Sequence, residues 1–142
     1  MFRRQMMAVS MVGLGALVLM ACGTTASNTS GGGPINVGIT GPFTGAYTDP
    51  GTAIRNAGQQ AVDEVNKAGG VNGRQLKVFA EDDACDAQQG TQAAQKLITD
   101  GIVINIGGYC SGASIPESDV FHRSGDIPFI TAASSNPKFT EQ

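Results

Sequence analysis

The sequence is poor in the residues from which most catalytic and metal sites are built. His122 is the only histidine among 142 residues, and there are three cysteines, Cys22, Cys85 and Cys110. A hydrolase with a serine or cysteine nucleophile needs a neighbouring base, and a structural zinc site needs four nitrogen or sulfur ligands. One histidine that is distant in sequence from both internal cysteines supports neither class, so we expect no enzyme activity.

Basic residues are also few. Nine Lys and Arg stand against twelve Asp and Glu, and they form no run. Removal of Arg3 and Arg4 with an N-terminal leader leaves seven basic residues against twelve acidic ones, a net charge of −5. Because nucleic-acid binding depends on basic patches, nucleic acid is not an expected partner.

Long apolar runs are limited to the N-terminus. Val9 to Met20 carries no charge but is too short to cross a membrane as a mature helix. It ends in Leu19-Met20-Ala21-Cys22, which resembles a bacterial lipobox. We therefore expect residues 1–21 to be a lipoprotein signal peptide and Cys22 to carry a lipid anchor, the alternative being an ordinary signal peptide with a chance cysteine.

Residues 22–34 contain no charged and no large apolar side chain after Cys22. Such a segment cannot bury enough surface to fold, which predicts a flexible tether.

Beyond the tether, strand and helix patterns alternate with a period of about thirty residues. The expected strands are residues 34–40, 75–81, 101–106 and 127–131, and the expected helices are residues 52–68, 87–99 and 114–124. This order predicts one α/β domain over residues 35–142, built on a parallel, doubly wound sheet. Because a new helix pattern begins near Phe139, we expect this domain to be truncated at its C-terminus.

Local signals predict how these elements begin and pack. Thr52 is a plausible N-cap for the first helix, and Ser114 with Pro116 in the first turn indicates the start of the third. The third strand is apolar except for Asn105, as is typical of a strand that is covered on both faces. The stripe expected to be buried on the first helix consists of Ile54, Ala57, Ala61, Val62 and Val65.

The two internal cysteines each lie four residues beyond a predicted strand, Cys85 after the second and Cys110 after the third. Both are therefore expected at the carboxyl edge of the sheet. An even pair in an exported protein is most simply a disulfide, and a loop of this length would stabilise the fold by about 3–4 kcal/mol. A catalytic thiolate is the alternative, but His122 is expected toward the opposite edge.

Ser111 lies in a turn of small residues that leads into the third predicted helix. The free N–H groups and the dipole of a helix N-terminus favour a carboxylate ligand, and helix capping is a compatible alternative. Residues 132–137 repeat this pattern after the fourth strand, with Ser134 and Ser135. Because ligands of doubly wound sheets bind at this edge, the two loops predict a polar cradle for a small ligand.

Three carboxylates, Asp82, Asp83 and Asp86, follow the second strand. Their spacing does not match a calcium-binding loop. We expect them to be solvated rather than to bind a metal.

Several segments together resemble the N-terminal lobe of periplasmic branched-chain amino-acid-binding proteins, the substrate-binding components of ABC importers. The matching segments are GITGPFTGAY, NAGQQAVDEVNKAGGVNGRQLKV, EDDACDAQQGTQAAQKLITDGI, GGYCSGASIPESDVF and IPFITAASSNP. The combination of DDACD with YCS at this separation is the most specific element. The resemblance covers residues 35–142 and implies the first of two α/β lobes that are joined by a hinge.

The resemblance also implies roles for individual residues. Cys85 and Cys110 would form a disulfide. Ser111 would hold the ligand α-carboxylate, while the Ala133 carbonyl and the Ser135 hydroxyl, where the family has a threonine, would bind the polar groups of the zwitterion. The side-chain pocket would be lined by Tyr109 and Tyr47.

As a whole protein, such a chain would bind a small amino acid, most simply a branched-chain one, and deliver it to the membrane permease subunits of an ABC importer. It would be extracytoplasmic, held at the membrane by its lipid anchor, and would need no cofactor. The remaining alternatives are a binding protein for an amide, urea or another small carboxylate on the same scaffold, and the ectodomain of a ligand-sensing receptor.

Overall fold

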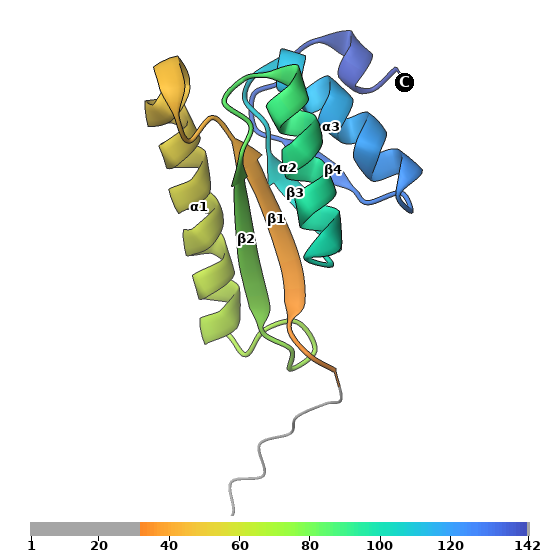
Figure 1. The fold of residues 1–142 in the computed structure, drawn as a ribbon. Coiled ribbons are helices and arrows are strands. Elements are labelled where there is room, and N and C mark those ends of the chain that lie inside the picture. The colour runs from red at the N-terminus through yellow and green to blue at the C-terminus, as the bar shows by residue number, and fades with distance from the viewer. Residues whose placement is uncertain (1–31, 142) are drawn as a thin grey trace, which may run out of the picture.

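The computed structural model describes residues 32–141 (Figure 1). The expected signal peptide, the lipidation site Cys22 and most of the expected tether lie outside these residues. The strands are β1 (Ile35–Gly41), β2 (Leu76–Asp82), β3 (Ile104–Gly107) and β4 (Phe129–Thr131). The α-helices are α1 (Thr48–Lys67), α2 (Ala87–Thr99) and α3 (Ser111–Arg123), with short 3-10 helices η1 (Gly45–Tyr47) and η2 (Pro137–Phe139).

The four strands form one parallel sheet in the order β2-β1-β3-β4. Helix α1 covers one face, while α2 and α3 lie side by side on the other (Figure 1). This is the predicted parallel sheet with helices on both faces, and it confirms the α/β fold class. Since all strands are parallel, their carboxyl ends meet at one edge, which we call the ligand edge.

The hydrophobic core lies between the sheet and the α2–α3 layer. Its centre is Leu97, Ile102 and Phe121, which are buried together with Ala94. The Phe121 ring contacts Phe129 of β4 edge-to-face at a centroid distance of 5.6 Å. This packing fixes α3 against the β4 side of the sheet.

Helix α1 begins four residues earlier than predicted, so Thr52 is not its N-cap. The helix starts at Thr48, and the Thr48 hydroxyl donates to the carbonyl oxygen of Gly45 at 2.7 Å. Pro50 is the third residue of this helix, and proline is tolerated in the first turn because an N–H there has no partner within the helix.

The buried stripe of α1 is also narrower than predicted. Gly58 and Val62 are buried, whereas Ala57, Ala61 and Val65 are exposed. A Cβ atom on Gly58 would come within 2.6 Å of the Ile39 side chain, so the helix approaches the sheet through a glycine. Sequence patterns that count only apolar side chains miss such a contact.

Helix α3 likewise begins at Ser111 rather than near Ser114, and Pro116 lies inside it. The proline removes the hydrogen bond that the carbonyl of Gly112 would otherwise accept. Gly112 is exposed, so water can satisfy that carbonyl. Helix α2, by contrast, has the predicted bounds, and Asp86 caps its N-terminus.

Strand β3 is shorter than predicted and is not covered on both faces. Val103 lies before the strand and is 55% exposed, and Ile130 on neighbouring β4 is 59% exposed. On the α1 side, Ile54, Ile106 and Ile130 line an apolar hollow. The apolar run predicted a strand that is buried on both faces. The described residues cover only one face of this strand fully.

Candidate functional site

The ligand edge brings together the loops that follow the four strands. The strand register places Gly41 of β1 opposite Asp82 of β2, and Thr40 and Thr131 each opposite Gly107 of β3. The four loops therefore leave the sheet at one level, at the end where η1 and the N-termini of α2 and α3 lie (Figure 1).

A disulfide joins two of these loops, as predicted. Cys85 in the β2–α2 loop is bonded to Cys110, with a Cα–Cα distance of 5.2 Å. Cys85 and Ala84 both adopt positive φ angles, 56° and 45°, which turns the loop toward its partner. Cys110 is the residue that precedes the first turn of α3, so the bond fixes the start of that helix.

Ser111 is the first residue of α3 and is half-buried at the ligand edge. The side chain of Cys110 makes no capping hydrogen bond to this helix, and the first N–H groups of any helix lack intrahelical partners. The Ser111 Oγ accepts a hydrogen bond of 3.3 Å from the amide of Asn136, in the loop after β4. The structure thus places the two predicted polar loops in direct contact.

A second pair of serines, whose contact was not predicted from the sequence, joins these loops at a more deeply buried position. The hydroxyl of Ser134 donates to the Ser114 Oγ at 2.7 Å, and both side chains are buried. The amide of Ser134 also donates to the Thr131 Oγ1 at 2.8 Å. Ala133 and Ser135, on either side of Ser134, are exposed at the edge.

Two tyrosines lie next to one another beside these loops. The rings of Tyr47 and Tyr109 are tilted by 46° with centroids 5.6 Å apart. Tyr47, at the end of η1, is 48% exposed, and Tyr109 directly precedes the disulfide. Together they present an aromatic surface that comes from two different loops.

The expectation that Asp82, Asp83 and Asp86 are solvated is wrong for Asp82 and Asp83 and holds for Asp86. Asp83 is fully buried and Asp82 is half-buried. Asp86 is exposed, where it accepts hydrogen bonds from the amides of Gln88 and Gln89. These carboxylates bind the protein's own backbone and side chains.

Asp82 fixes the loop that leads to η1. Its carboxylate accepts hydrogen bonds from the amide of Phe43 at 2.7 Å, from the amide of Ala84 at 2.9 Å and from the hydroxyl of Thr44. Burial opposes its ionisation, but the hydrogen bonds from Thr44, Ala84 and Phe43 outweigh it and hold the pKa below its usual range.

Buried polar side chains form a chain of hydrogen bonds beneath the edge. The amide of Asn105 donates to the Thr40 Oγ1 at 2.8 Å, and the Thr40 hydroxyl donates to the Glu117 Oε2 at 2.9 Å. Asp83 lies beside Glu117 and accepts from the amide of Cys85 at 2.8 Å. Sequence reasoning missed this group, although a single polar residue in an apolar strand, Asn105, was a signal for it.

Burial shifts the acid equilibria of this group. Desolvation, and then the charge of Asp83, raise the pKa of Glu117 to about 8. Desolvation also raises the pKa of Asp83, against the lowering effect of its hydrogen bond from the Cys85 amide. Two adjacent carboxyls in one dry site cannot both ionise easily.

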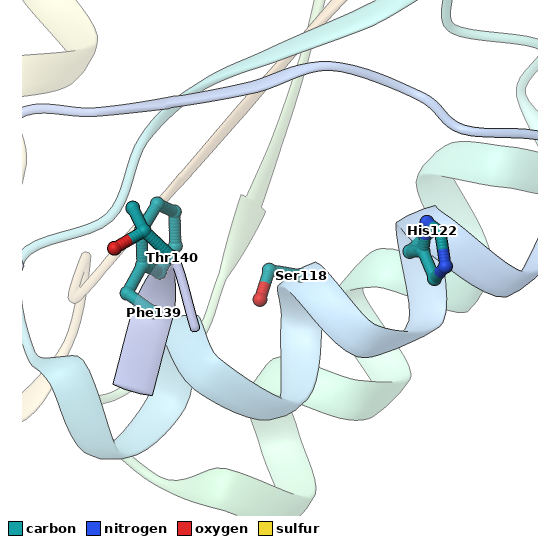
Figure 2. Close-up of a pocket in the computed structure, with 4 residues that line it drawn as sticks. All are labelled: Ser118, His122, Phe139 and Thr140. Carbon is teal, nitrogen blue, oxygen red and sulfur yellow. The ribbon is translucent and has the colours of Figure 1, made fainter. Parts of the chain in front are cut away.

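The single histidine lies away from Cys110 and Ser111. Figure 2 shows His122 and Ser118 on successive turns of α3, beside Phe139 and Thr140 near the C-terminal end of the chain. His122 Nδ1 contacts the exposed carboxylate of Asp126 at 2.6 Å. His122 is eleven residues beyond Ser111, about 16 Å along the helix, which is too far for it to act as a base there.

Within residues 32–141, no three His, Cys, Asp or Glu side chains gather as metal ligands would. The same residues include no helix that is both long and apolar enough to cross a membrane.

Comparison with known proteins gives consistent matches. The model of a family described as periplasmic binding protein matches residues 34–142. The Leu/Ile/Val-binding protein homolog 2 of Brucella abortus is 37% identical over 121 residues, which cover 85% of this chain and 32% of that protein. The chain thus spans about a third of the length of the curated relatives that it matches.

Two solved structures share its fold. The branched-chain amino acid transporter substrate binding protein LivJ of Streptococcus pneumoniae, in complex with isoleucine, aligns with a TM-score of 0.71 at 27% identity, over 76% of this chain and 31% of that one. A solute binding protein of an ABC transporter from Rhodopseudomonas palustris, in complex with 3,4-dihydroxy benzoic acid, aligns with a TM-score of 0.67 at 26% identity, over 76% and 29%.

Proposed function

This chain belongs to the periplasmic binding protein family, and from that membership we propose that residues 35–142 are the N-terminal lobe of a solute-binding protein that captures a small amino acid. A branched-chain amino acid is the ligand that we propose first, because the relatives and LivJ are named for such ligands. The observation that carries the proposal is the contact between the start of α3 and the loop after β4, made through Ser111 and Asn136.

The α-carboxylate would lie at the N-terminus of α3. The Ser111 hydroxyl and the first N–H groups of the helix are donors suited to an anion, and the helix dipole favours a negative charge there. The α-ammonium would lie against the loop after β4, with the carbonyl of Ala133 and the hydroxyl of Ser135 as acceptors. Their exposure leaves both groups open to a ligand.

The ligand side chain would lie against Tyr47 and Tyr109. The two rings form an apolar wall that could contact an aliphatic or an aromatic group. A small aromatic carboxylate is therefore the second candidate ligand, and the Rhodopseudomonas protein in complex with 3,4-dihydroxy benzoic acid supports it. Both ligands would use the same carboxylate site, and neither requires catalysis.

We also propose the cellular setting. Residues 1–21 would direct export, Cys22 would carry the lipid anchor, and residues 22–34 would tether the lobe on the extracytoplasmic side of the membrane. The partners would be the permease subunits of an ABC importer, as the names of the related transporter proteins suggest.

Isothermal titration calorimetry on the full-length protein tests the ligand. Leucine, isoleucine and valine are titrated alongside 3,4-dihydroxybenzoate. Heat with the amino acids supports the first candidate, and heat with the benzoate alone supports the second. No heat with any of them contradicts the proposal.

The Ser111→Ala variant tests the site itself. Loss of a hydrogen bond to a charged group is expected to weaken binding by about 1.5–3 kcal/mol. Ser124→Ala, at the other end of α3, is the matched control, with unchanged affinity expected. An unchanged affinity of Ser111→Ala would refute the role of Ser111.

A further inference from the structure

Two buried carboxylate oxygens beneath the ligand edge have no hydrogen-bond donor among the described residues. They are Oδ2 of Asp83 and Oε1 of Glu117. The other oxygen of each group has a donor, the amide of Cys85 for Asp83 and the hydroxyl of Thr40 for Glu117. Both side chains are fully buried.

The two carboxyls lie within hydrogen-bonding reach of each other. A proton on either one supplies the donor that both lack, since a protonated carboxyl donates through O–H while the ionised one accepts. Two unpaired ionised carboxylates in the same site would be strongly unfavourable. The chain makes room for this arrangement at Gly90 of α2, where a Cβ atom would come within 2.9 Å of the Glu117 Oε1.

We propose that Asp83 and Glu117 form an acid pair that shares one proton, and that this pair positions the ligand-binding end of α3 so that affinity for a carboxylate ligand falls as the pair loses its proton. The second part rests on the proposed function.

Both members of the acid pair connect to the site. Glu117 is on α3, six residues beyond Ser111, which is about 9 Å along the helix. Asp83 binds the amide of Cys85, whose disulfide partner Cys110 immediately precedes Ser111. A second negative charge in the pair would push apart the two elements that fix Ser111.

The groups around the acid pair do not offset that charge. The neutral side chains of Thr40 on β1 and Asn105 on β3 face the acid pair. The backbone at Gly90 faces it from α2. The charged group acting on Asp83 from its own loop is Asp82, which adds a further negative charge. Burial accordingly keeps the pKa of Glu117 high, at about 8.

A bound carboxylate at the start of α3 makes the second ionisation harder still. By linkage, ionisation of the pair must then weaken the binding of that carboxylate by the same factor. For charges about 9 Å apart, and an effective dielectric constant between those of the protein surface and water, the factor is about 2- to 20-fold. The weakening should develop as the pH rises through about 8.

The test measures ligand affinity against pH for the full-length protein, with leucine and 3,4-dihydroxybenzoate as the probes. Glu117→Gln keeps an N–H donor for Asp83 and an oxygen for Thr40 but cannot titrate. Wild type should lose about 2- to 20-fold in affinity between about pH 6.5 and about pH 9, beyond any loss in Glu117→Gln. Glu64→Gln, an exposed change on α1, should follow wild type.

The possible outcomes separate the acid pair from the proposed function. Parallel profiles of wild type and Glu117→Gln overturn the effect on affinity while leaving ligand binding intact.

If neither probe binds at any pH, the proposed function and its pH effect fail. Infrared spectroscopy then tests the shared proton by itself. A carboxylic-acid C=O band that persists above about pH 6 in wild type, where ordinary carboxyls are ionised, supports the shared proton, and its absence overturns it. The band needs no variant, so the test stands if Glu117→Gln fails to fold.

Discussion

Removal of the Cys85–Cys110 disulfide is expected to lower the free energy of unfolding by about 3.5 kcal/mol. The bond joins residues 25 apart in the sequence. In the chain-entropy model, a loop of that length removes about 12 cal/mol/K from the unfolded chain, which is about 3.5 kcal/mol at room temperature. The folded state should change little, because other bonds hold both ends: Asp83 binds the amide of Cys85, and the Cys110 carbonyl accepts from the amides of Ala113 and Ser114 at 3.0 Å each.

Urea denaturation of the full-length protein, followed by circular dichroism, measures this effect. All variants carry Cys22→Ser, so that lipidation does not affect solubility. The double variant Cys85→Ala/Cys110→Ala is compared with Cys22→Ser alone, both without reductant. A difference below about 1 kcal/mol would refute the entropic reasoning. Addition of reductant to the Cys22→Ser protein should reproduce the loss without any change of side-chain volume.

Three further predictions concern the ligand edge. Because its pKa is raised from 4.5 to about 8, Glu117 binds its proton more tightly in the folded state, so wild-type stability should fall with rising pH across that interval, by up to about 1.4 kcal/mol per pH unit, and then level off. Glu117→Gln should abolish this slope in urea titrations, and a slope equal to wild type would contradict the assignment. Gly108→Ala should lower stability by more than about 1 kcal/mol, because Gly108 has a φ of 67° and a Cβ there would come within 2.7 Å of a buried serine hydroxyl. Gly112→Ala, where the Cβ meets open space, is its control in thermal unfolding, and equal melting temperatures of the two variants would refute the strain. Ser134→Ala should cost about 1 kcal/mol in unfolding free energy through its lost buried hydrogen bond. The neighbouring exposed change Ser135→Ala should leave stability unchanged and lower ligand affinity only, so equal stability losses in the two would contradict this distinction.

The sequence was sufficient for the order of elements because each element carries its own local signal. Helix α2 was predicted with its observed bounds, and in the structure Asp86 caps its N-terminus. The starts of α1 and α3 were predicted too late for one shared reason. Proline and glycine in the first turns, such as Pro50 and Gly112, resemble loop residues in sequence although a helix start tolerates them.

The candidate site was predictable only in part, because its residues are positioned by partners distant in sequence. Cysteine pairing could be inferred from two cysteines at one sheet edge. By contrast, nothing near Glu117 in the sequence indicates that it packs against Asp83 or that Thr40, 77 residues away, donates to it. A glutamate on a helix usually faces water. The space that admits it comes from Gly90, and the sequence alone does not show which residue faces a glycine.

The covalent and hydrogen bonds between neighbouring loops affect how the ligand edge would bind a ligand. The disulfide joins the loop after β2 to the loop after β3. The hydrogen bond between Ser134 and Ser114 joins the loop after β4 to the start of α3, and Asp82 accepts a hydrogen bond from the amide of Phe43 in the loop after β1. Each of these bonds is made between residues of the chain itself. Ordering of loops on binding costs free energy that reduces affinity. Because the chain's own bonds hold the start of α3 in place, we expect the carboxylate end of the site to need little ordering when a ligand binds.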